Sequence, residues 1–255
     1  MTACEEQKLF LKIVLDIAES MMQSGAEIDR VENTVNRMAK AYGVTRVDTF
    51  AIISSIVVTI EMPDGETLTQ TRRIVLGGNT DFARLEALNR ISREYCAERF
   101  SVEELKSRFE GCSQPFSQLK YYLGSVIAAA GFAVFFGGNL FDAVVSAVFA
   151  VVICAFSNVA PKFCPNNIIS KFLCSLIVGL GICTVCRLFP TLHYDMIMIG
   201  DIMLLIPGIA LTNSIRNLII GDTVSGLTRF TECLVLAGAL AGGFMLSIVL
   251  LGGAV

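Results

Sequence analysis

The first half of the chain shows two helical patterns of apolar residues followed by a strand-like one. Apolar residues recur every three or four positions across residues 5–23 and again across 27–42, which predicts two amphipathic helices. From residue 50 to residue 62 the period changes to two, which predicts one long strand. The Pro-Asp-Gly sequence at 63–65 predicts a tight turn, and residues 67–76 then pair back as a second strand.

Two further helices follow this hairpin. Asp81 is placed to cap a helix whose apolar residues run from Leu85 to Tyr95. Ser101 and Glu104 have the spacing of a capping box at the start of a short helix. We therefore predict a small α+β domain over residues 1–115, with the element order ααββαα.

The second half, residues 116–255, loses both periods and becomes almost continuously apolar. Each apolar stretch is close to the ~20 residues that a helix needs to cross a bilayer. The pattern predicts an all-α bundle of about five transmembrane helices, and the fourth is the least regular. The predicted spans are 119–137, 140–160, 168–188, 196–215 and 230–252.

Composition supports this division into a water-compatible and a lipid-compatible half. Hydrophobic residues make up 54% of the chain, the mean hydropathy is +0.65, and 32 of the 43 Asp, Glu, Lys and Arg residues precede Lys120. The net charge of −3 is too small to argue for nucleic-acid binding. The sequence thus predicts a multi-pass protein of the lipid bilayer.

The basic residues of the loops predict an orientation. The N-terminal residues are polar and acidic, so we expect no signal peptide and a cytoplasmic N-terminal domain. Of the basic residues in the membrane half, only Arg187 then lies outside the cytoplasm, which satisfies the positive-inside rule. The C-terminus is also expected outside. The basic residues on the cytoplasmic side are Lys120, Lys162, Lys171, Arg216 and Arg229.

No catalytic, metal or cofactor site is predicted. The chain has neither a phosphate-binding glycine loop after a strand nor a Ser/His/Asp or Cys/His set. Cys183 and Cys186 have CxxC spacing, but they stand inside an apolar run where cysteine packs as a small apolar residue. His193 is the sole histidine, which argues against a zinc site.

The densest polar patch of the N-terminal domain surrounds the start of the second predicted helix. It comprises Glu27, Asp29, Arg30 and Glu32, and Gly25 ends the helix before it. One interpretation is a solvated helix face on which Glu27 pairs with Arg30. The other is a contact surface for the membrane half or for a partner.

Asp201 is the most unusual residue of the membrane half, because an intramembrane carboxylate is costly and marks a functional candidate. The alternative is that its helix begins later in the sequence, which would place Asp201 at the level of the lipid headgroups. Pro207 and Gly208 predict a kink or a break in the same helix. Broken helices in membranes line cavities, and in transporters they often form the binding site.

Polar residues then continue into the last span. Asn213 and Arg216 are expected on one helical face, with Asn217. A second face is formed by residues spaced three, four and three apart, namely Asp222, Ser225, Arg229 and Glu232. These residues either form a hydrophilic path into the bundle, or cap the last helix and lie at the interface.

These motifs resemble those of the threonine/serine exporter family. The membrane motif is Pro207-Gly208, Asn213, Arg216 and Gly221-Asp222-x-x-Ser225-Gly226. The N-terminal domain matches with Ser24-Gly25-Ala26-Glu27, Arg30-Val31-Glu32 and Asn89-Arg90-Ile91-Ser92-Arg93. The resemblance extends from about Leu11 to Gly243.

The resemblance implies a specific kind of exporter. Full exporters of the family join a soluble domain and five spans to a second set of four or five spans. This chain resembles the first part, the larger subunit of a split two-component exporter of the bacterial cytoplasmic (inner) membrane. The implied partner is a second small membrane subunit. The implied substrates are threonine, serine or small dicarboxylates such as succinate. Self-association is left open.

The resemblance also suggests a mechanism. Arg216 would hold the carboxylate of the substrate near the break at Pro207, in the fork geometry of a guanidinium, and Asp201 would carry a coupling proton. Two other functions remain open: a membrane-anchored sensor or scaffold, and a membrane-bound hydrolase with its site in the N-terminal domain.

Overall fold

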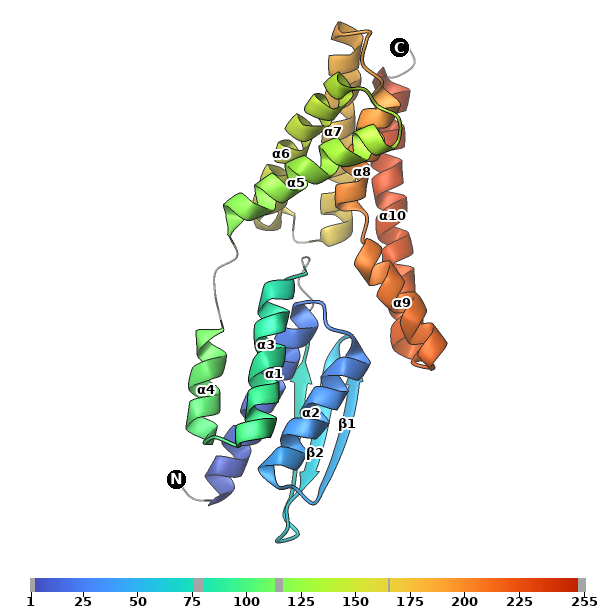
Figure 1. Cartoon of the computed structure of the whole chain (residues 1–255). Coiled ribbons are helices and arrows are strands. Elements are labelled where there is room, and N and C mark those ends of the chain that lie inside the picture. Colours follow the sequence, from blue (N-terminus) through green and yellow to red (C-terminus); the bar gives the residue numbers. More distant parts are fainter. Residues whose placement is uncertain (1–2, 76–79, 113–116, 165, 252–255) are drawn as a thin grey trace. The chain divides into compact units, whose positions relative to one another are not determined.

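The computed structural model of the chain describes residues 3–75, 80–112, 117–164 and 166–251. It is mostly helical (Figure 1). The chain divides into an N-terminal unit and a helical unit that begins at Ser117. The predicted domain boundary at 115–116 lies outside the described residues.

The N-terminal unit is an α+β domain with three strands, so the predicted order ααββαα is wrong. The sheet has the order β1-β2-β3 and is antiparallel throughout. The elements are α1 (Ala3–Gln23), α2 (Ile28–Tyr42), β1 (Arg46–Ile52), β2 (Ser55–Glu61), β3 (Thr67–Arg73), α3 (Phe82–Glu98) and α4 (Val102–Gly111).

The predicted long strand is in fact a hairpin. Ile52 pairs with Ser55, so a two-residue turn at 53–54 reverses the chain. Such turns usually contain Gly, Asn or Asp, and this one contains Ile and Ser, which hid it in the sequence. The turn also changes which positions are buried: Ile56 is buried, whereas Phe50 of β1 is 62% exposed.

Several local predictions for this unit are confirmed. The turn after β2 places Gly65 at φ +87°, and the Gly65 amide donates to the Met62 carbonyl at 2.9 Å. Asp81 caps α3 by accepting from the Arg84 amide at 2.9 Å. Ser101 caps α4 by accepting from the Glu104 amide at 3.2 Å, whereas the Glu104 carboxylate pairs with Arg108.

Helices α1 and α2 cover one face of the sheet and form its core (Figure 1). The largest buried side chains include Phe10 and Ile17 of α1, Met38 of α2 and Ile60 of β2. A charged group on β3 also faces α1, since Arg72 pairs there with Asp16 and, at 3.5 Å, with Glu19.

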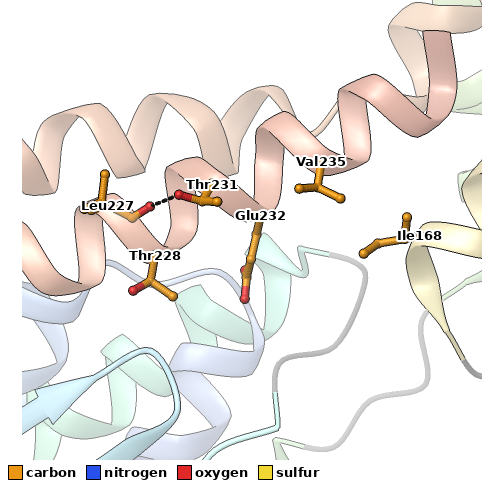
Figure 2. A pocket seen from close by; sticks show the side chains of 6 residues that line it. All are labelled: Ile168, Leu227, Thr228, Thr231, Glu232 and Val235. Atoms are coloured by element: carbon orange, nitrogen blue, oxygen red, sulfur yellow. Dashed lines mark hydrogen bonds between the residues drawn. The ribbon is translucent and has the colours of Figure 1, made fainter. Parts of the chain in front are cut away.

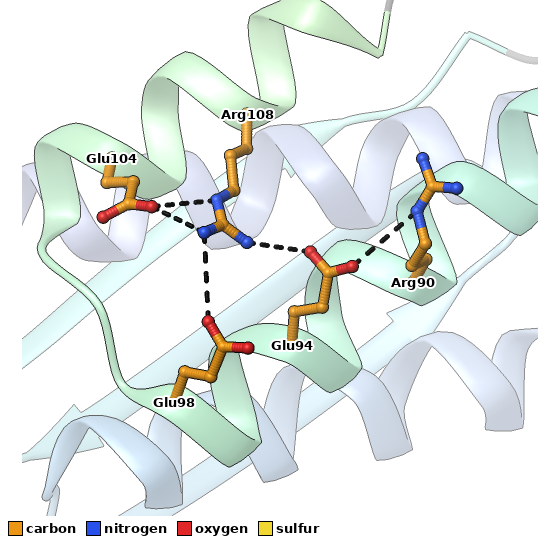
Figure 3. Close-up of polar contacts among 5 residues, drawn as sticks. All are labelled: Arg90, Glu94, Glu98, Glu104 and Arg108. Carbon is orange, nitrogen blue, oxygen red and sulfur yellow. Dashed lines mark hydrogen bonds and ion pairs between the residues drawn. The ribbon is translucent and has the colours of Figure 1, made fainter.

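An arginine cluster joins α3 to α4 (Figure 3). Arg108 of α4 pairs with Glu94 at 2.9 Å and with Glu104 at 2.6 Å, and it lies 3.9 Å from Glu98. Its guanidinium also lies over the Phe100 ring, 4.1 Å from the centroid. Because these carboxylates come from two helices, the cluster fixes α4 against α3.

The helical unit has four helices that are long and apolar enough to cross a membrane, and five spans if one bent helix pair is counted as one. The bent pair is α8 and α9, and the last helix begins earlier than predicted, at Thr223. The elements are α5 (Gln118–Phe135), α6 (Leu140–Phe163), α7 (Asn167–Leu188), α8 (Tyr194–Leu205), α9 (Gly208–Ile220) and α10 (Thr223–Leu251). Residue 252, the predicted end of the last span, lies outside the described residues.

Small residues allow the helices of this unit to approach one another closely. A Cβ atom added at Gly243 of α10 would lie 2.0 Å from the Ser175 hydroxyl of α7. One at Gly179 of α7 would lie 2.2 Å from the Ser247 hydroxyl of α10. This reciprocal contact is the small-residue packing that is typical of membrane helices.

Candidate functional site

The predicted site residue Asp201 is fully buried in α8. Ser146 of α6, also fully buried, donates its hydroxyl to Asp201 Oδ1 at 3.1 Å. The other carboxylate oxygen, Oδ2, is buried and has no hydrogen-bond partner among the described residues. A buried polar atom without a partner is costly, so this oxygen is suited to binding a proton or another donor.

Glycine at position 200 makes this arrangement possible. A Cβ atom there would lie 2.7 Å from the Ser146 hydroxyl and 2.8 Å from the Ala129 carbonyl oxygen of α5. Only a residue without a side chain lets α5, α6 and α8 meet at this point. The three helices therefore enclose Asp201 and remove it from solvent.

A second polar cluster lies at the start of α6. Asp142 and Asn139 form a capping box there, with bonds of 2.8 and 2.9 Å. Asp142 is fully buried and also accepts hydrogen bonds from the His193 amide and from its Nδ1 atom, both at 2.9 Å. The bond between Nδ1 and Asp142, together with the negative charge of Asp142, raises the pKa of His193, which precedes α8.

The predicted break in the fourth span is confirmed. Ile206 is extended, with φ −65° and ψ 130°, as expected for a residue before proline. Pro207 cannot donate a backbone hydrogen bond, and α9 starts at Gly208 at an angle of 57° to α8. The break between α8 and α9 lies six residues after Asp201, which belongs to α8.

The polar residues of α9 differ in exposure. Asn217 is buried and Asn213 is half-buried, whereas Arg216 is exposed. Ser214 is fully buried and donates to the Leu211 carbonyl at 2.7 Å. Of the predicted residues on this helix, Asn213 is therefore more enclosed than Arg216.

The four predicted residues at the start of α10 fall into two groups. Asp222 caps the helix by accepting from the Ser225 amide at 3.3 Å. Ser225 is buried, and its hydroxyl has no partner among the described residues. Arg229 and Glu232 form an ion pair of 2.9 Å one turn further on.

Glu232 also lines an open groove of about 450 Å³ along α10 (Figure 2). The apolar lining comes from Leu227 and Val235 of α10 and from Ile168 of α7. Thr231 contributes methyl surface, since its hydroxyl donates to the Leu227 carbonyl at 2.8 Å. Glu232 is thus a charged group at the border of an otherwise apolar groove.

The predicted contact residues of the N-terminal unit have local structural roles. Gly25 has φ +94°, and a Cβ atom there would lie 2.5 Å from Thr80. Glu32 accepts from the Ala51 amide of the edge strand β1 at 2.7 Å. Burial raises the pKa of Glu32, and this hydrogen bond counteracts part of the increase.

Glu27 and Arg30 lie at the start of α2. Glu27 is the extended residue that precedes the helix, and Arg30 is exposed in its first turn. Both are placed at the same end of α2 as the turn around Gly25.

Sequence reasoning missed the residues that surround Asp201 and the capping box. Asp142, Ser146, Ala150 and Cys154 follow one another every four residues along α6, and all four are buried. Residues with this spacing share one helical face, and two of the four, Asp142 and Ser146, are polar. That spacing was the available signal for a buried polar face.

Together, the long apolar helices, the broken span and the buried carboxylate define a multi-pass membrane protein with a polar interior. Its family follows from comparison: the model of the ThrE threonine/serine exporter family matches residues 12–251. The chain belongs to the threonine/serine exporter family, which is a family of transporters. No solved structure shows a significant similarity to the chain.

Two curated relatives are informative. A protein of Mycobacterium tuberculosis named "Probable threonine/serine exporter" is 22% identical over 245 residues, which cover 93% of this chain and 45% of that protein. A protein of Klebsiella aerogenes named "Probable succinate transporter subunit YjjP" is 24% identical over 265 residues, which cover 97% of this chain and 96% of that protein. The chain thus spans about half of the mycobacterial relative and nearly all of the second.

Proposed function

We propose that this chain is one subunit of a membrane exporter for small polar metabolites, and that it works with a second small membrane subunit. One observation supports the second subunit: the Klebsiella relative, of which the chain covers 96%, is named as a subunit. The substrate is either an amino acid of the threonine/serine type or a small dicarboxylate such as succinate.

The observation that carries the proposal is the buried carboxylate of Asp201, with one oxygen bonded to Ser146 and the other without a partner among the described residues. A membrane protein that only anchors another domain gains nothing from such a costly group. Ionisable residues inside membranes mark ion paths and proton relays. Asp201 is therefore the proposed carrier of a coupling proton.

The substrate path passes the break between α8 and α9. Ile206 and Pro207 lie outside regular helix there, and irregular backbone at membrane depth is tolerated where it lines a cavity. Arg216 is the proposed cation for a substrate carboxylate on α9. Residues Asn213, Asp222, Ser225, Arg229 and Glu232 are proposed to border the same hydrophilic path.

The proposed orientation places the N-terminal unit in the cytoplasm and the C-terminus outside the bacterial inner membrane. Basic residues at loops and helix ends support it, since five of six would then face the cytoplasm. In this orientation the surface around Gly25, Glu27, Arg30 and Glu32 is a proposed contact site for a partner or for the membrane half.

Efflux from preloaded cells tests the proposal. Cells carrying labelled threonine, serine or succinate would express the full chain alone, or together with a small membrane protein that is encoded beside it. Efflux of one solute only when both proteins are present is the expected result. Absence of efflux of all three, with both proteins found in the membrane, would favour the sensor or scaffold function. Hydrolysis of a small ester or peptide by the purified chain would favour the hydrolase.

A further inference from the structure

Lys171 is a half-buried cation on the inner face of α7. It lies in the second turn of that helix, three and four residues before Cys174 and Ser175, which are both buried. Residues with this spacing share one helical face, so the stem of Lys171 starts on the side of α7 that packs against the bundle. Among the described residues, none forms a hydrogen bond or an ion pair with its ammonium group.

The buried face around Lys171 is continuous with the surroundings of Asp201. Cys174 lies within electrostatic range of Lys171, of Asp201 and of Cys154 on α6. Tyr121 of α5 lies near Cys154 in turn. Lys171, Cys174, Cys154 and Asp201, which come from α6, α7 and α8, thus belong to one region of the helical unit.

The distance between the two α6 residues of this region, Ser146 and Cys154, follows from the helix geometry. Ser146, which holds Asp201, and Cys154 are eight residues apart, which corresponds to about 12 Å. Lys171 lies three residues before Cys174, toward the start of α7. The cation and the carboxylate are therefore separated along the path and do not neutralise each other by direct contact.

Lys171 differs from the other cations that the structure describes in this unit. Arg229 is paired with Glu232. The remaining ones are all exposed, namely Lys120, Lys162, Arg187 and Arg216. Among the described residues of the helical unit, Lys171 alone combines partial burial with an ammonium group that has no acidic partner.

We propose that Lys171 binds the carboxylate of the exported substrate inside the bundle. This rests on the proposed exporter function and deepens it, since threonine, serine and succinate share a carboxylate. An ionisable residue that faces a bundle interior is a functional residue by default, and Lys is a flexible point charge that can follow a moving anion. Arg216, which is exposed, then serves at an end of the path rather than inside it.

Transport kinetics of the full chain test this, in liposomes that also contain the second membrane subunit. The half-saturating concentrations of threonine, serine and succinate would be measured for wild type, Lys171→Met, Lys171→Arg and Lys162→Met. Lys162 is the matched control, because it is an exposed lysine near the end of α6, across the short connection to α7. Loss of a charged hydrogen bond of about 1.5–3 kcal/mol corresponds to a roughly 10- to 100-fold change.

The expected result is a half-saturating concentration that rises 10- to 100-fold in Lys171→Met, recovers in Lys171→Arg and is unchanged in Lys162→Met. Threoninamide and succinamide, which lack a carboxylate, should compete equally well with wild type and Lys171→Met. If Lys171 only contacts lipid headgroups, Lys171→Met changes the amount of inserted protein, but its half-saturating concentration equals that of the wild type. This result would overturn the proposal. Absence of transport by the wild type would instead overturn the exporter function itself.

Discussion

Replacing Gly200 by alanine tests how tightly the bundle encloses Asp201. The added methyl group would lie 2.7 Å from the Ser146 hydroxyl, 2.8 Å from the Ala129 carbonyl oxygen and 3.1 Å from the Ala133 Cβ atom. The Ala129 oxygen belongs to the backbone of α5, so it cannot rotate away. Helices α5 and α8 must therefore separate, and overpacking of this kind costs about 1–3 kcal/mol.

Gly131 on α5 provides the matched control. It also lies inside a helix, but an added Cβ atom there has no neighbour within 4 Å. Gly131→Ala should therefore gain the helix preference of alanine, about 0.5–1 kcal/mol. The same chemical change is thus expected to have opposite signs at positions 200 and 131.

Thermal unfolding in detergent, followed with a thiol-reactive dye, measures both variants. The dye is suited to this chain because Cys154, Cys174 and Cys183 are buried and become accessible on unfolding. Gly200→Ala should melt below the wild type and Gly131→Ala at or above it. A melting temperature of Gly200→Ala equal to or above that of Gly131→Ala would refute the close packing around Asp201.

Two further predictions concern other parts of the chain. Gly25→Ala should lower the melting temperature of the full chain more than Gly65→Ala. Both glycines have positive φ, which costs about 1–2 kcal/mol for alanine, but of the two only Gly25 would also place a Cβ atom against another residue. Equal losses in melting temperature would contradict this. The stabilising bond between His193 and Asp142 should be complete below the ordinary histidine pKa of about 6.5 and decline as the pH rises through the raised pKa. His193→Gln should therefore flatten the melting temperature measured against pH in that range, and an unchanged slope would argue against the bond.

Features with a local cause could be predicted from the sequence. The turn at Gly65, the helix cap at Asp81 and the break at Pro207 each depend on the backbone chemistry of a few adjacent residues. The number of spans followed from the length of the apolar stretches. The turn at residues 53–54 was missed because Ile and Ser carry no turn signal, and the alternation of apolar residues on both sides of it reads as one strand.

Features that depend on packing between helices could not be predicted in this way. Asp201 was recognisable as an intramembrane carboxylate, but its partner Ser146 is 55 residues away in the chain. The hydrogen-bond partner of Asp142, His193, is likewise distant, 51 residues away. The four-residue spacing on α6 indicates a shared face, yet only tertiary structure shows which helix that face contacts.

Flux through Asp201→Asn tests whether Asp201 couples export to a proton gradient. Asp195→Asn is the matched control, since Asp195 is exposed on the same helix. Both variants would be measured in vesicles with the second subunit, at equal amounts of inserted protein, with and without an imposed proton gradient. If Asp201 carries the coupling proton, Asp201→Asn loses gradient-driven flux while Asp195→Asn retains it. Wild-type flux through Asp201→Asn would refute this role.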